Sequence, residues 1–129
     1  RALKARLPAL EAITIPGITS FCAAAALTNF PIGEGKQPLT IVPTADDLAS
    51  VRRAIDGGGT IVLMKIADLL PEILDLLERN GLMDQSVFIA KAGQKGQRIE
   101  NDLRKLRDEK AKIGYLSVIL VHAHRENCE

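Results

Sequence analysis

Two histidines near the end of the chain are the first residues whose spacing suggests chemistry. His122 and His124 are two residues apart. On a strand they would share one face, where their ring nitrogens could bind a single metal ion. No Cys/His cluster supplies further ligands, and Cys128 lies one residue from the end of the chain. The sequence therefore predicts no metal site.

A catalytic nucleophile is not indicated either. No serine lies in the Gly-x-Ser-x-Gly turn of a nucleophile elbow. Cys22 lies in the apolar run Phe21–Leu27, so we interpret it as a small core residue rather than a nucleophile. Two cysteines give no disulfide framework, which favours a reducing, cytoplasmic compartment.

Three glycine-rich segments could bring backbone close to a ligand. In Gly33-Glu34-Gly35-Lys36-Gln37, a glutamine replaces the Ser/Thr that would hold magnesium in a phosphate loop, and no strand precedes it, so this segment is interpreted as a surface turn. Gly57-Gly58-Gly59 is typical of a turn between a helix and a strand. Gly93-Gln94-Lys95-Gly96 follows an apolar run of strand length, which is a suitable place for a ligand to approach the backbone.

Composition narrows the classes of function. The 129 residues include 17 Lys+Arg and 16 Asp+Glu, and this balance does not favour nucleic-acid binding. Aromatic residues make up 3%, too few for a base-stacking surface. The apolar stretches fall far short of the ~20 residues of a membrane helix. We expect one soluble domain without a nucleic-acid or membrane partner and, because the chain begins at Arg1 without a signal peptide, a fragment.

From Leu39 onward, short β-branched runs alternate with amphipathic segments, which predicts an α/β sheet covered on both faces. We expect Thr44 or Asp46 to cap the first of these helices and Gly57 to end it. The charged segment Glu100–Lys112 is interpreted as a solvated helix face. The expected strands are Leu39–Val42, Thr60–Met64, Ser86–Ala90 and Tyr115–Val121, and the expected helices are Asp46–Ile55, Asp68–Asn80 and Asp102–Lys110.

The first third of the chain is less regular. Arg1–Leu10 is compatible with the end of a helix, although Pro8 interrupts it. Ala12–Ile15 is a short expected strand that Pro16-Gly17 stops. Thr19 or Ser20 then caps a helix that runs through four alanines to about Thr28. These small side chains would let the helix lie close against a backbone or a ligand.

Three ordered segments resemble one family. Ile15-Pro16-Gly17-Ile18-Thr19-Ser20-Phe21-Cys22, followed by Ala23–Ala26, resembles the Pro-Gly turn and alanine-rich helix of the tetrapyrrole methylases, the S-adenosylmethionine-dependent enzymes of cobalamin and sirohaem biosynthesis. Thr60–Lys65 resembles the strand whose terminal Met lies by the cofactor. Val87–Gly93, followed by Gln97-Arg98, resembles the later strand that ends in a glycine turn. The likeness extends from about Ala12 to Val121.

Within the family, Ser20–Cys22, the Gly33–Gly35 loop and Met64-Lys65 most resemble the precorrin-2 or cobalt-factor II C20-methyltransferases. The family's amino-terminal half, with its glycine-rich cofactor loops, has no counterpart here. The resemblance therefore implies that residues 1–129 are the carboxy-terminal domain of a two-domain methyltransferase, a mixed five-stranded sheet flanked by helices.

The resemblance also implies ligands and partners. It places Thr19, Ser20, Met64 and Gly93 against S-adenosylmethionine. It also implies that this methyl donor meets the tetrapyrrole in a cleft between the two halves of the enzyme, and that the full-length enzyme forms a homodimer. It names no catalytic base. The alternative from another class is a stand-alone, non-catalytic α/β domain that binds a ligand or regulates another protein.

Overall fold

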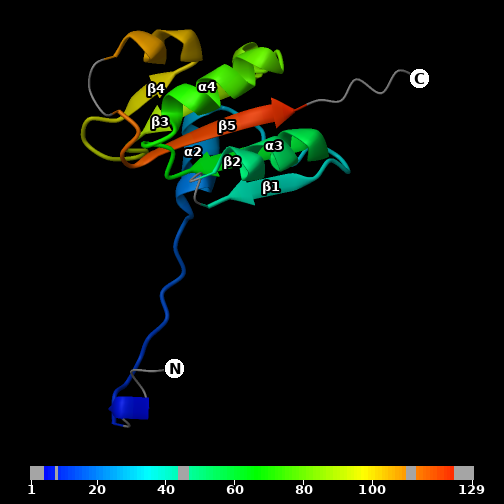
Figure 1. Ribbon diagram of the computed structural model, residues 1–129. Helices are drawn as coiled ribbons and strands as arrows, with labels where there is room; N and C mark the ends of the chain where they lie inside the picture. Colours follow the sequence, from blue (N-terminus) through cyan, green and yellow to red (C-terminus); the bar gives the residue numbers. More distant parts are fainter. Residues whose placement is uncertain (1–4, 8, 44–46, 110–112, 124–129) are drawn as a thin grey trace.

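A mixed five-stranded sheet forms the centre of the molecule (Figure 1). The computed structural model describes residues 5–7, 9–43, 47–109 and 113–123. The strand order is β1-β2-β5-β3-β4, with β1 parallel to β2 and every other neighbouring pair antiparallel. This arrangement confirms the predicted fold class. The strands are β1 (Leu39–Val42), β2 (Gly59–Met64), β3 (Ser86–Ala90), β4 (Arg98–Glu100) and β5 (Ser117–Ala123).

Helices cover both faces of the sheet, as expected. One face packs against α2 (Ser20–Thr28), and the other packs against α3 (Leu48–Gly57) and α4 (Leu70–Arg79). Successive residues of a strand point to opposite faces, so Val62 joins the α2 side while Ile61 and Leu63 join the α3/α4 side. Within the described ranges, none of the helices has both the length and the apolar character needed to span a bilayer.

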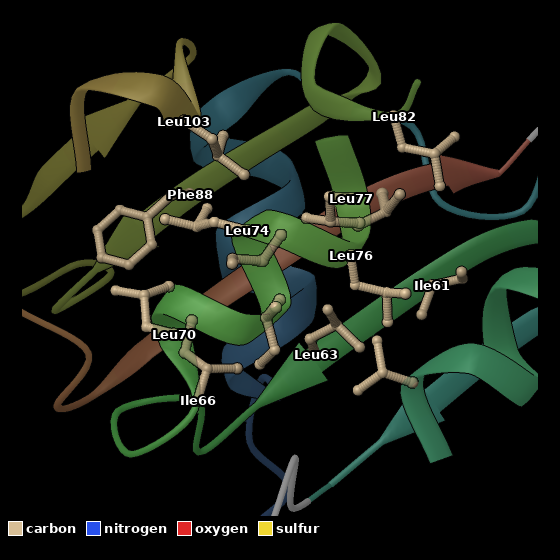
Figure 2. Packing of buried hydrophobic residues seen from close by; sticks show 14 of the residues in the cluster. Ile61, Leu63, Ile66, Leu70, Leu74, Leu76, Leu77, Leu82, Phe88 and Leu103 are labelled. Carbon is tan, nitrogen blue, oxygen red and sulfur yellow. The ribbon is translucent and has the colours of Figure 1, made fainter. Parts of the chain in front are cut away.

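The larger of the two cores lies under α4 (Figure 2). Leu74 and Leu77 of α4 are at most 1% exposed and share this cluster with Phe88 of β3. Burial of such side chains contributes roughly 1.5–3 kcal/mol each. On the opposite face, Ala24 and Ala25 are buried, and their small side chains allow α2 to lie close to the sheet, as the alanine run predicts.

Capping explains where the helices differ from expectation. The N-cap of α3 is Asp47, whose carboxylate accepts a hydrogen bond of 2.7 Å from the Ser50 backbone N–H, so the choice of Thr44 or Asp46 is corrected. Both of those residues lie outside the described part of the chain. The helix extends through Gly57, and Gly58, rather than Gly57, is its C-cap.

The segment expected as a helix over Asp102–Lys110 is a 3₁₀ helix, η2 (Leu103–Asp108), and Lys110 lies outside the described residues. Its buried residues, Leu103 and Leu106, are three apart, and this spacing matches the three-residue turn of a 3₁₀ helix. A further short 3₁₀ turn, η1 (Met83–Gln85), precedes β3. Strand β4 was not expected; it pairs Ile99 with Ile89 of β3.

The segment before α2 differs most from the sequence prediction. Residues 11–19 form neither strand nor helix, so the strand expected at Ala12–Ile15 is wrong. None of the described strands pairs with this segment, and Ile13 and Ile15 are 88% and 84% exposed. Figure 1 shows the segment extending away from the sheet. Residues 1–4 and 8 of the helix expected over Arg1–Leu10 lie outside the described residues.

The interpretation of Cys22 as a core residue is also wrong. Its side chain is exposed on α2, whose buried residues are Ala24 and Ala25. The run that contains it is apolar throughout, so a hydrophobic pattern alone does not show which of its side chains face the sheet.

Candidate functional site

A pocket of about 470 Å³ lies where β2 and β3 end and β5 begins. Strand register brings these ends together: Met64 pairs with Val118, and Ala90 pairs with Ser117. The start of α2 and the turns that follow β2 and β3 and precede β5 complete the wall. Its volume and its mainly apolar lining with a few polar groups are typical of a small-molecule site.

Left-handed backbone surrounds this pocket. Lys65, directly after β2, has φ 51°, and Lys91, directly after β3, also has φ 51°. Leu116, directly before β5, has φ 52°. Non-glycine residues rarely adopt this conformation, and strained backbone concentrates at functional sites. The Lys91 N–H donates a hydrogen bond of 2.9 Å to the Leu116 carbonyl, which ties two of these turns together.

The turn before β5 is held tightly on its inner side. Gly114 lies so close to Ala67 that a Cβ at position 114 would be 2.3 Å from the Ala67 Cα. The Ser117 hydroxyl donates a hydrogen bond to the Gly114 carbonyl. Only glycine fits this approach, and the contact fixes the wall that carries Tyr115 and Leu116.

Two of the four predicted cofactor residues meet in the pocket. Ser20 and Met64 both line it, although they belong to separate sequence segments. Thr19 is the N-cap of α2, adjacent to Ser20, and its side chain makes no capping hydrogen bond. Ser20, the first residue of α2, therefore brings the start of this helix to the pocket, and N–H groups at a helix start can donate to a polar ligand.

Gly93 lies in the turn between two lining residues, Ala92 and Gln94, and is not itself in the lining. Its φ of 70° is left-handed, as the choice of glycine implies. Its N–H donates a hydrogen bond of 2.7 Å to Gln97 Oε1, and a Cβ at this position would meet no atom within 4 Å. A ligand can therefore approach Gly93 at its Cα, whereas its N–H is already bonded to Gln97.

Sequence reasoning missed several lining residues. Lys65 and Asp68 follow β2 and are the charged side chains of the lining; Tyr115 and Leu116 precede β5. Tyr115 was assigned to the final strand, because the apolar run from 115 to 121 shows no break. Gly114, directly before that run, was the available signal that a turn occupies its first residues and that the strand begins later.

Residues 33–37, residues 57–59 and His122 are not among the residues that line this pocket. Residues 33–37 are an exposed turn, in which the Gln37 N–H donates a hydrogen bond to the Glu34 carbonyl. His122 stacks on Phe30 with ring centroids 4.1 Å apart, and its Nδ1 lies 3.3 Å from Thr60 Oγ1. His124 lies outside the described residues, and the described part of the chain has no cluster of three potential metal ligands.

In the described part of the chain, the ion pairs around η2 include no residue that lines the pocket. The Arg104 guanidinium donates a hydrogen bond of 2.7 Å to Asp84, which lowers the pKa of that carboxyl. Arg98 likewise donates to Glu109 and lowers its pKa. Arg107 bridges η2 to Asp75 and Glu78 of α4. These pairs fasten η2 to its surroundings rather than prepare a reactive group.

Comparison with known proteins gives a consistent picture. Residues 1–107 match the family described as Tetrapyrrole (Corrin/Porphyrin) Methylases. A cobalt-precorrin-2 C(20)-methyltransferase of Salmonella typhimurium is 29% identical over 115 residues, which cover 89% of this chain and 48% of that protein. A precorrin-2 C(20)-methyltransferase of Sinorhizobium sp is 29% identical over 107 residues, which cover 83% and 42%.

A solved structure shares the fold. The X-ray structure of a cobalt precorrin-4 methyltransferase of cobalamin biosynthesis matches with a TM-score of 0.60 and 22% identity, covering 84% of this chain and 50% of that chain. The chain spans about half the length of the curated relatives it matches. These similarities confirm the resemblance inferred from the three sequence segments.

Proposed function

The chain belongs to the tetrapyrrole methylase family, and from that premise we propose that it is the carboxy-terminal half of an S-adenosylmethionine-dependent enzyme that methylates C20 of precorrin-2 or cobalt-factor II. The observation that carries this proposal is the meeting of Ser20 and Met64 in one pocket. Each comes from a different segment of the family resemblance, and the resemblance assigns both to the cofactor.

The pocket fits the nucleoside part of S-adenosylmethionine. Met64, Ile89 and Val118 supply an apolar surface, while Ser20 and Gln94 supply polar groups at its margin. Methionine adapts its shape to a flat ring, and the N-terminus of α2 offers backbone N–H groups to polar atoms. Gly93 lets a ligand approach its Cα, where no protein atom lies within 4 Å of the position of an added Cβ.

Bound S-adenosylmethionine supplies an electrophilic methyl group for a nucleophilic ring carbon. The residues of this chain hold and orient that donor and help to exclude water, and positioning of this kind lowers the barrier. We assign none of them as a general base.

Cofactor binding is tested on the intact product of the gene by titration calorimetry with S-adenosylmethionine. We expect Gly93→Leu to weaken binding, because its side chain would enter the space that the cofactor occupies. Gly81→Leu is a matched control, because Gly81 also has a left-handed φ (68°) and open space around its Cβ position. Gly81 follows the C-terminal end of α4 and does not line the pocket. Equal affinity of Gly93→Leu and wild type would remove Gly93 from the site.

Turnover is tested with labelled S-adenosylmethionine and precorrin-2. We expect the 129-residue chain alone to fold but to give no methyl transfer, because it holds part of a site and immobilising a ligand costs ~4–15 kcal/mol. The exposed Ile13, Ile15 and Ile18 favour self-association of the isolated chain. The proposal is refuted if this chain alone gives methyl transfer, or if the intact product does not bind S-adenosylmethionine. If the intact product binds S-adenosylmethionine but gives no methyl transfer, the result favours a non-catalytic ligand-binding domain.

The proposal includes a homodimer of the intact protein and a cytoplasmic location. Sedimentation of the intact product tests the first, and fractionation of cells tests the second. The support for the location is the cysteine usage, since two cysteines give no disulfide framework.

A further inference from the structure

An exposed aromatic ring lies at the pocket. Tyr115 is 72% exposed, whereas Phe21 and Phe30 are half-buried and Phe88 is fully buried. Its neighbour Leu116 is 53% exposed and lines the same pocket. Large apolar surfaces that stay in water next to a ligand pocket mark a binding surface, because folding alone would favour their burial.

This surface is held rigid by its backbone. Gly114 packs against Ala67 without room for a Cβ, and the Ser117 hydroxyl donates to the Gly114 carbonyl. The Leu116 carbonyl accepts the Lys91 N–H. A ring carried on a fixed turn loses little conformational freedom when a ligand covers it, so it contributes more to binding than a ring on a free loop.

Lys65 adds a positive charge to the same rim. It lines the pocket with Tyr115, is exposed and has a left-handed φ. Within the described residues Lys65 forms no ion pair, as is also true of Lys91 after the neighbouring strand β3. A lysine kept unpaired beside a pocket is available for an anionic group of a ligand.

We propose that Tyr115 and Lys65 recognise the tetrapyrrole, Tyr115 through the face of its ring and Lys65 through a carboxylate at the edge of the macrocycle. This inference rests on the proposed function. The inner wall of Met64, Ile89 and Val118 is the part assigned to the cofactor. Because Tyr115 lines the pocket and is nevertheless 72% exposed, it suits a ligand wider than the pocket, and a tetrapyrrole is a wide, flat ring system with carboxylate side chains.

The test measures steady-state kinetics of the intact gene product with precorrin-2 and S-adenosylmethionine. We expect Tyr115→Ala to raise the KM for precorrin-2 by about tenfold, with the Kd for S-adenosylmethionine unchanged. Tyr115→Phe keeps the ring face and restores most of the loss. Lys65→Gln raises the same KM a few-fold and reduces its dependence on salt, since a surface charge pair is screened.

Ile99→Ala is the matched control, because Ile99 is an exposed apolar residue of β4 outside the pocket lining. It leaves both constants unchanged. An unchanged KM for precorrin-2 in Tyr115→Ala overturns the inference, and so does a raised Kd for S-adenosylmethionine, which would assign the ring to the cofactor. Either result is measured against a wild-type enzyme that binds the cofactor and methylates precorrin-2. If the proposed function itself is wrong, the wild type does neither, so the two failures can be told apart.

Discussion

Adding one methyl group at Gly114 tests the packing that shapes the pocket. An alanine Cβ there would lie 2.3 Å from the Ala67 Cα and 2.9 Å from the Ala67 N. Carbon atoms in good contact are ~3.5–4.0 Å apart, so one backbone segment must move by roughly 1 Å. Overpacking of this kind costs ~1–3 kcal/mol, and the entropic gain of replacing glycine by alanine returns ~0.4–1 kcal/mol. We expect Gly114→Ala to lower the free energy of unfolding by about 2 kcal/mol, since the nearest atom it meets, the Ala67 Cα, is backbone.

Urea unfolding of the 129-residue chain, followed by far-ultraviolet circular dichroism, measures this change. Gly57→Ala is the matched control, because Gly57 ends α3, no atom lies within 4 Å of its Cβ position, and its φ is not left-handed. The control should unfold at the same urea concentration as wild type or slightly higher. Equal midpoints for Gly114→Ala and wild type would refute the close approach of Gly114 to Ala67.

A second change separates backbone from side-chain contact. Ala67→Gly in the Gly114→Ala background removes the contact with the Ala67 Cβ but leaves the contact with its Cα. The double variant should therefore recover only a small part of the lost stability. Full recovery would contradict the conclusion that the two backbones limit this approach.

Two further expectations concern charge at helix ends and on η2. Asp47→Ala removes the N-cap hydrogen bond of α3 and should lower the melting temperature, while Asp47→Asn should restore most of the loss in the same thermal melt. Hydrogen bonds from Arg104 and Arg98 lower the pKa values of Asp84 and Glu109, so the stability from these pairs is present above the ordinary carboxyl pKa of about 4 and is lost as pH falls through their lowered values. Urea midpoints between pH 6 and pH 2 should fall less steeply in Arg104→Gln than in wild type, and parallel curves would contradict this assignment.

Strands β1 and β3 were predicted with their observed bounds, whereas β5 begins two residues later than expected. Pro43 follows β1 directly, and β3 matches its expected bounds of Ser86–Ala90. The three residues of β4 were not predictable from pattern, because Arg98-Ile99-Glu100 has too few residues to show alternation. Its pairing depends on β3, which supplies the neighbouring backbone.

Helix type and helix start depend on contacts that periodicity does not specify. Leu103 and Leu106 are three apart, a spacing that an α-helix and a 3₁₀ helix both accept. Asp46 and Asp47 are equally suited to capping by residue type, and the hydrogen bond between the Asp47 carboxylate and the Ser50 N–H decides which one acts.

The candidate site was partly predictable for a different reason. Ser20 and Met64 were found through resemblance to a family, since an N-cap neighbour and an apolar strand residue carry no chemical signal of their own. Tyr115 and Leu116 belong to an apolar run that the sequence assigns to a strand, and their place in the pocket wall depends on the contact of Gly114 with Ala67. Such a contact between distant segments exists only after the strands have paired.

The distribution of left-handed backbone supports the view that this edge of the sheet is shaped for a ligand. In the described residues, four non-glycine residues have positive φ, and Asn29 is explained by its place as the C-cap of α2. The other three, Lys65, Lys91 and Leu116, flank strands at the pocket. A left-handed conformation costs a non-glycine residue roughly 1–2 kcal/mol, and glycine would relieve that cost. The chain instead has side chains at all three positions, and two of these residues, Lys65 and Leu116, line the pocket. The stability of the turns does not explain why these residues are not glycine. Contact of their side chains with a ligand in the pocket does explain it.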